Sequence, residues 1–155
     1  MIIETGQLSQ TEKRFTGEEQ TSVLALKHDP FVEVKGPIKY DLRACLVYFE
    51  IVIRGMLEVE LSCICSRCAE RFSYIVKVAA FFQSYKLTAE NESIDLTNDI
   101  REDILLSFPI IWVCSPTCRG LCSRCGVNLN KQVCSCESEK DNQVWSTLDQ
   151  LNIRQ

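Results

Sequence analysis

Paired cysteines are the feature that most constrains this chain. The 155-residue sequence contains ten cysteines, and eight of them fall into four closely spaced pairs. The pairs are Cys65 and Cys68, Cys114 and Cys118, Cys122 and Cys125, and Cys134 and Cys136. A tetrahedral zinc site takes four thiolates at about 2.3 Å from the ion, and two close pairs can provide them. The sequence therefore predicts eight metal ligands and two structural Zn²⁺ ions.

The way in which the four pairs combine stays open at this point. In one arrangement the pair at 122–125 joins the pair at 134–136, because a short intervening loop closes at low entropic cost. The pair at 65–68 then joins the pair at 114–118. In the other arrangement the pairs at 114–118 and 122–125 form one site, which leaves the pairs at 65–68 and 134–136 for the second site.

Paired cysteines also have uses other than zinc binding. The first residues lack a secretory signal, and the longest apolar runs are far shorter than the roughly 20 residues of a membrane span. We therefore expect a cytoplasmic protein without membrane contact, in which disulfides are disfavoured. An iron–sulfur cluster and a dithiol redox site at Cys65 and Cys68 are the remaining alternatives.

Ala69 and Gly126 follow the two C-x2-C pairs, which is typical of the sharp turn of a zinc knuckle.

Hydrophobic periodicity predicts the fold class. Apolar and polar residues alternate along 31–61 and 72–78. Within the first stretch, Val47, Phe49, Ile51 and Ile53 form one apolar face of a strand that is expected to end at Gly55, and residues 38–42 and 57–61 alternate in the same way. This pattern predicts an antiparallel meander, and residues 86–95 read as a polar loop. We expect one α+β domain over 1–155, with a variable N-terminal arm at 1–30, antiparallel strands with a zinc knuckle at 31–85, a packed helix at 96–109, a zinc-ribbon-like cysteine region at 112–137 and a C-terminal helix at 141–153.

Composition and motifs argue against an enzyme. The chain has a net charge of −4 and one histidine. It has no glycine-rich phosphate loop and no metalloprotease or serine-hydrolase motif. If cysteine fills all four positions of each zinc site, no position remains for a catalytic water. We therefore predict a non-enzymatic protein with no small-molecule substrate.

The motifs around the cysteines resemble those of a known family. Residues 65–72, the helix segment at 94–109 that ends in a proline, and the cysteine block at 114–136 are similar to motifs of the bacterial large ribosomal RNA subunit accumulation (YceD-like) proteins. The resemblance extends over about 31–150. It implies ribosome biogenesis through synthesis, processing or accumulation of large-subunit rRNA, with no known catalytic step. The partner it implies is rRNA, a ribosomal protein or a pre-ribosomal particle.

Basic residues near the cysteines are candidate RNA contacts. Between Cys114 and Cys136 the charged side chains are all basic, and further arginines flank the first pair. The candidate patch consists of Arg67, Arg71, Arg119, Arg124 and Lys131. These residues could contact phosphates, or they could offset thiolate charge. The alternative function is therefore a zinc-stabilised protein–protein adaptor without RNA contact.

Overall fold

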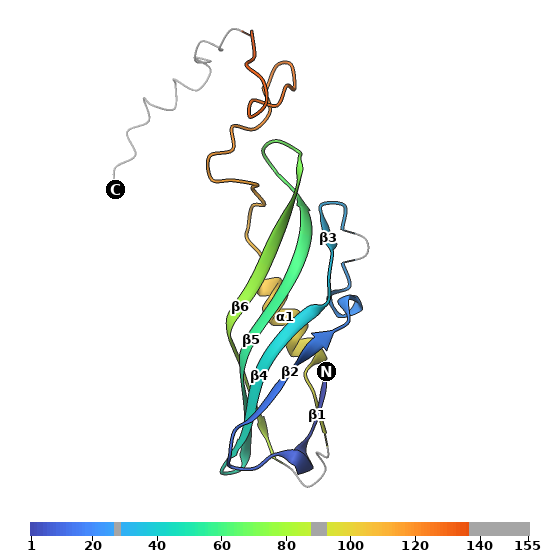
Figure 1. The fold of residues 1–155 in the computed structure, drawn as a ribbon, viewed down its shortest axis with the longest axis vertical. Helices are drawn as coiled ribbons and strands as arrows, with labels where there is room; N and C mark the ends of the chain where they lie inside the picture. Colours follow the sequence, from blue (N-terminus) through green and yellow to red (C-terminus); the bar gives the residue numbers. More distant parts are fainter. Residues whose placement is uncertain (27–28, 88–92, 137–155) are drawn as a thin grey trace, which may run out of the picture.

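A twisted antiparallel sheet forms most of the protein. The computed structural model describes residues 1–26, 29–87 and 93–136. The strands of the sheet are β2 (Lys13–Glu19), β3 (Val32–Val34), β4 (Ile38–Val47), β5 (Glu50–Ile64) and β6 (Arg71–Lys86). Strand β5 is central: β4 and β3 pair along one of its edges and β6 along the other, while β2 pairs with β4 (Figure 1).

A helix and a small second sheet cover one face of the large sheet. Strand β1 (Ile2–Glu4) pairs with β7 (Ser93–Asp95), and α1 (Thr97–Leu106) follows directly. Two short 3₁₀ helices, η1 (Thr5–Gln7) and η2 (Thr21–Leu24), complete the described elements. In Figure 1, α1 lies behind the strands. Ile100 and Ile104 of α1 are fully buried in one core with the inward residues of the sheet, such as Leu42 and Ile53.

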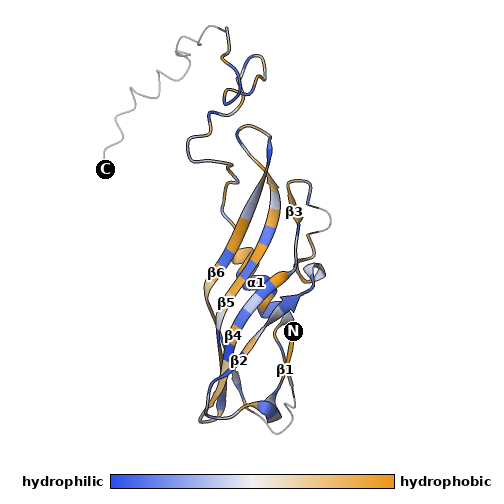
Figure 2. Cartoon of the chain, viewed as in Figure 1, coloured by the Kyte–Doolittle hydropathy of each residue, from blue (hydrophilic) through white to orange (hydrophobic). Residues whose placement is uncertain are grey.

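The period-two alternation of the sequence separates the two faces of the sheet. Figure 2 shows apolar and polar residues alternating along β4 and β5. Leu57, Val59 and Leu61 of β5 are buried, whereas Arg54 and Glu60 of the same strand are exposed. An antiparallel sheet commonly packs one face on the core and leaves the other in water. The predicted antiparallel sheet with a packed helix is thus confirmed.

The strand order is more complex than the expected meander. Strand β3 does not pair with the neighbouring β4 but with the far end of β5, where Val34 lies opposite Leu61. The region expected to be an arm, 1–30, contributes β1 and β2 to the two sheets. These strands show little alternation of apolar and polar residues. Each of them pairs with a strand that is distant in the sequence, β1 with β7 and β2 with β4.

The strand expected to end at Gly55 instead continues through it. Tyr48 and Phe49 form the turn between β4 and β5, so Phe49 is exposed rather than part of the buried face. A Cβ atom on Gly55 would lie 2.1 Å from the carbonyl oxygen of Asp41. Glycine is therefore needed here for close approach of two backbones within a sheet, and not for a turn.

The remaining boundaries also differ from the expected ones. Strand β6 extends to Lys86, and Ser93–Asp95 form β7 within the segment expected to be a polar loop. The helix is Thr97–Leu106 instead of 96–109. The predicted helix at 141–153 lies outside the described residues. Within the described residues, no helix has the length and apolar character needed to cross a membrane.

Candidate metal centre

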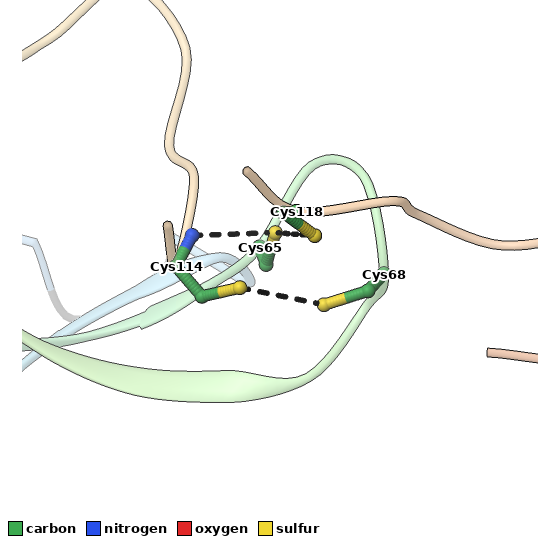
Figure 3. Close-up of side chains that lie close together, drawn as sticks. All are labelled: Cys65, Cys68, Cys114 and Cys118. Carbon is green, nitrogen blue, oxygen red and sulfur yellow. Dashed lines mark hydrogen bonds between the residues drawn. The ribbon is translucent and has the colours of Figure 1, made fainter. Parts of the chain in front are cut away.

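The first group of cysteines joins the tip of the β5–β6 hairpin to the segment after α1. Cys65 and Cys68 lie in the hairpin turn, and the segment after α1 brings Cys118 beside Cys65 and Cys114 toward Cys68 (Figure 3). The Sγ atoms of Cys65 and Cys118 are 3.9 Å apart, and those of Cys68 and Cys114 are 3.7 Å apart. All four sulfurs lie within 4.8 Å of one another. Three of these cysteines are buried, and Cys114 is exposed.

The second group is local in sequence and more open to solvent. Cys122, Cys125, Cys134 and Cys136 also place their sulfurs within 4.8 Å of one another. The Sγ atom of Cys134 lies 3.4 Å from that of Cys122 and 3.5 Å from that of Cys125. None of the four is buried. A ligand held here would therefore be less shielded from water and chelators than one held by the first group.

The two C-x2-C turns have the same backbone hydrogen bonds. In the first, the N–H of Cys65 donates to the carbonyl of Glu70, and the N–H of Ala69 donates to that of Cys65, both at 2.9 Å. In the second, Cys122 donates to Val127 at 2.8 Å and Gly126 to Cys122 at 2.9 Å. Ala69 and Gly126 have φ angles of 57° and 72°. The sharp turns predicted at these two small residues are confirmed.

The sulfur spacing fits a tetrahedral metal site. Four sulfurs placed about 2.3 Å from a central ion lie about 3.8 Å from one another. The observed separations of 3.4–3.9 Å are close to this value. They are much longer than the roughly 2.05 Å of a disulfide bond, and all ten cysteines are free. Each group could therefore hold one metal ion.

The structure groups the cysteines in the first of the two arrangements considered from the sequence. The pair at 65–68 lies with the pair at 114–118, and the pair at 122–125 lies with the pair at 134–136. Cys45 and Cys63 belong to neither group. Burial, followed by the charge of Asp29, raises the pKa of Cys63 to about 11, so this residue stays a neutral thiol in the core.

The thiols within each group differ widely in acidity. Burial opposes ionisation of Cys65, but backbone N–H donors, foremost that of Cys114, outweigh it and lower its pKa to about 6. The N–H groups of Cys125 and Arg124 lower the pKa of Cys122 to about 6. The hydrogen bond with Cys118 and then burial raise the pKa of Cys114 to about 12. Each group thus contains a cysteine that is mostly ionised at pH 7, next to cysteines whose thiols would lose their protons only when a metal cation binds.

Two asparagines that sequence reasoning missed form hydrogen bonds that hold the first cysteine group in place. The Nδ2 of Asn130 donates to the Sγ of Cys118 at 3.3 Å, and its Oδ1 accepts the backbone N–H of Arg119 at 2.8 Å. Asn128 in turn accepts from the backbone N–H of Asn130 at 3.0 Å. The alternating Asn-x-Asn after the Gly126 turn is the only signal in the sequence for this role.

Several of the basic residues predicted to face RNA contact other parts of the protein. Arg67 donates to the carbonyl oxygens of Pro116 and Cys118 at 3.3 and 3.2 Å. Lys131 pairs with Glu70 at 2.6 Å. Arg71 lies 3.5 Å from a carboxylate oxygen of Glu33. Arg119 and Arg124 are exposed, and the role of the whole set in RNA binding stays a prediction.

The sequence of the chain matches a protein family over about two thirds of its length. Residues 53–152 match the family described as "Large ribosomal RNA subunit accumulation protein YceD". The chain belongs to the YceD family. The match includes all eight paired cysteines, β6 and α1, so the family's characteristic region contains both cysteine groups.

Two curated plant proteins are similar to part of the chain. The chain is 36% identical over 62 residues to the large ribosomal RNA subunit accumulation protein YCED homolog 1, chloroplastic, of Arabidopsis thaliana. It is 42% identical over 50 residues to the protein of the same name from Zea mays. These segments cover 40% and 32% of this chain but only 19% and 17% of the relatives. No solved structure matches the chain.

Proposed function

We propose that this YceD-family chain is a non-enzymatic factor that supports synthesis, processing or accumulation of large-subunit rRNA in the cytoplasm. Two structural zinc ions, one in each cysteine group, would hold its zinc-ribbon-like region. Membership of the family supports the rRNA role, since both relatives carry large ribosomal RNA subunit accumulation in their names. The expected partners are rRNA, a ribosomal protein or a pre-ribosomal particle.

The completeness of both cysteine groups is the observation that carries the proposal of a structural, non-enzymatic protein. Each group offers four sulfurs at tetrahedral spacing, so a bound zinc ion would have no position left for water or substrate. Such closed sites stabilise structure instead of activating a nucleophile. The turns that hold the sulfurs would then become a rigid surface without chemical activity of their own.

Depletion of the protein in its own organism tests the rRNA role. We expect the ratio of large-subunit to small-subunit rRNA to fall, with large-subunit precursors accumulating on northern blots. Re-expression of the wild-type chain should restore the ratio. An unchanged ratio after complete depletion would contradict the proposed function.

Zinc binding by four thiols per group should release protons. At pH 7 we expect about two to three protons per zinc ion, because Cys65 and Cys122 are already ionised while the weakly acidic thiols must deprotonate. Protons compete with the metal, so zinc affinity should fall as pH falls. Calorimetric titration of the metal-free chain in buffers of different ionisation enthalpy measures the number.

A matched variant tests the source of the protons. In Cys114→Ser the most weakly acidic thiol of the first group is absent, since its pKa is raised to about 12 in the wild type by Cys118 and burial. A serine hydroxyl is a poor zinc ligand, so the first group should no longer hold its ion, and proton release should fall by the two to three protons expected for one ion. Zinc uptake without any proton release at pH 7 would show that the thiols are not the ligands.

The adaptor function is the second candidate. The internal contacts of Arg67, Arg71 and Lys131 favour it, because these side chains already have partners. Crosslinking in cells followed by sequencing of the bound RNA separates the two functions. Enrichment of large-subunit rRNA among the crosslinked RNA supports direct contact. If depletion lowers large-subunit rRNA but no rRNA is enriched by crosslinking, the adaptor function is supported.

A further inference from the structure

A row of three arginines crosses the uncovered face of the sheet. Strand register places Arg14 of β2 opposite Arg43 of β4, and Arg43 opposite Arg54 of β5. Phe82 of β6 continues the row next to Arg54. Directly opposed side chains project from the same face, with Cβ atoms about 4.5–5.5 Å apart. Like charges at this spacing destabilise a sheet, so folding alone does not explain the row.

The outer two arginines of the row form ion pairs with carboxylates, whereas the central one acts on Asp41 only through its charge. Arg14 donates from Nε and Nη2 to the two carboxylate oxygens of Asp41, at 2.8 and 2.7 Å. Arg54 pairs with Glu12. Arg43 is exposed and forms no hydrogen bond or salt bridge with any residue that the structure describes. Three guanidinium groups against two carboxylates leave the row positive, with its central side chain available to a ligand.

A hollow opens beside this row at an irregularity in strand pairing. Between the Gly55 and Leu57 positions of β5 the register shifts, so that Ala79 and Ala80 of β6 together face Met56. The small alanine side chains leave an open hollow of about 530 Å³, lined also by Arg43, Phe82 and the ion-paired Asp41. Phe82 is 60% exposed and Met56 is 54% exposed. β-Bulges of this kind are over-represented next to functional sites.

We propose that the hollow and the arginine row bind single-stranded RNA. A base would lie against Phe82, and the adjoining phosphate would pair with Arg43. Guanidinium groups bind phosphate oxygens through paired hydrogen bonds, and unpaired bases stack on aromatic side chains. The combination of an unpartnered arginine with an exposed aromatic ring matches both parts of a nucleotide. The inference deepens the proposed function, on which it rests, by naming the surface through which rRNA is contacted.

The test measures binding of a fluorescein-labelled oligouridylate to the full chain, purified with its metal, by fluorescence anisotropy at several salt concentrations. We expect Arg43→Gln to weaken binding about fivefold at low salt and to reduce the salt slope by about 0.7, the value of one phosphate contact on a single strand. Phe82→Ala should weaken binding at least about fivefold with an unchanged salt slope, because stacking involves no counterion release.

A matched control removes the same charge elsewhere. Arg101 is exposed on α1, which covers the opposite face of the sheet, so Arg101→Gln should bind like the wild type. The melting temperature of Arg43→Gln should equal or exceed that of the wild type, since the substitution relieves repulsion between neighbouring arginines. A weakened affinity would then not be a folding defect.

Three outcomes would overturn the inference. One is equal affinity and salt slope for wild type, Arg43→Gln and Phe82→Ala. A second is the absence of oligouridylate binding by the wild type. The third is that polyglutamate displaces the oligouridylate from the wild type and from Phe82→Ala but not from Arg43→Gln. This result would indicate an acidic protein segment as the occupant. The proposed function is judged separately, by rRNA levels in depleted cells, so it can survive any of these results.

Discussion

Cys68→Ser should reduce the zinc content of the chain from about two equivalents to about one and detach residues 112–136 from the hairpin tip. A serine hydroxyl is a poor zinc ligand, and a structural zinc site contributes roughly 10–16 kcal/mol in zinc-finger peptides at pH 7. The three buried sulfurs of the first group form a cluster separate from the main core. The sheet should therefore stay folded while the cysteine region loses its attachment.

Hydrogen exchange followed by mass spectrometry, together with metal analysis, measures this effect. We expect peptides from 112–136 to exchange at least about 100-fold faster in Cys68→Ser, whereas peptides from β4 and β5 keep their protection. Cys45→Ser is the matched control, because Cys45 lies in β4 outside both sulfur groups. It should retain both zinc equivalents.

The second cysteine group provides a contrasting variant. Cys134→Ser should also lose one zinc equivalent, but the hairpin turn that carries Cys65 and Cys68 should remain protected, since its partners Cys114 and Cys118 are intact. Retention of two equivalents by Cys68→Ser, or unchanged exchange across 112–136 after one equivalent is lost, would contradict the structural role of the metal.

Gly55→Ala should destabilise the protein by about 3 kcal/mol, although it adds one methyl group. The new Cβ would lie 2.1 Å from the carbonyl oxygen of Asp41 and 2.8 Å from the Cα of Leu42. Both are backbone atoms of the paired strand β4, and they cannot move aside without breaking the pairing of β4 with β5. For a domain of this size, the loss corresponds to a fall in melting temperature of about 6–12 °C.

Urea denaturation of the wild type and variant measures the free energy of unfolding. Gly36→Ala is the matched control, because no atom lies within 4 Å of a Cβ built at that position. Its free energy of unfolding should stay within about 0.5 kcal/mol of the wild type. If Gly55→Ala were as stable as Gly36→Ala, the close approach of β4 and β5 at this point would be refuted.

The sequence by itself determined the local chemistry of this protein. Cysteine spacing predicted the eight candidate metal ligands but left open which pairs would join, and the small residues at 69 and 126 predicted the turns, because these features depend on a few neighbouring residues. Alternation with period two predicted strands and their buried face, and the apolar spacing before Pro109 predicted a helix.

Only the tertiary structure decided which distant segments meet. It placed the pair at 114–118 against the hairpin tip at 65–68, joined β1 to β7, and carried β5 through Gly55. It also aligned Arg14, Arg43 and Arg54, which are scattered along the chain and carry no shared local signal. Register between strands arises from packing of the whole core, so a row of side chains across three strands cannot be seen in any one segment.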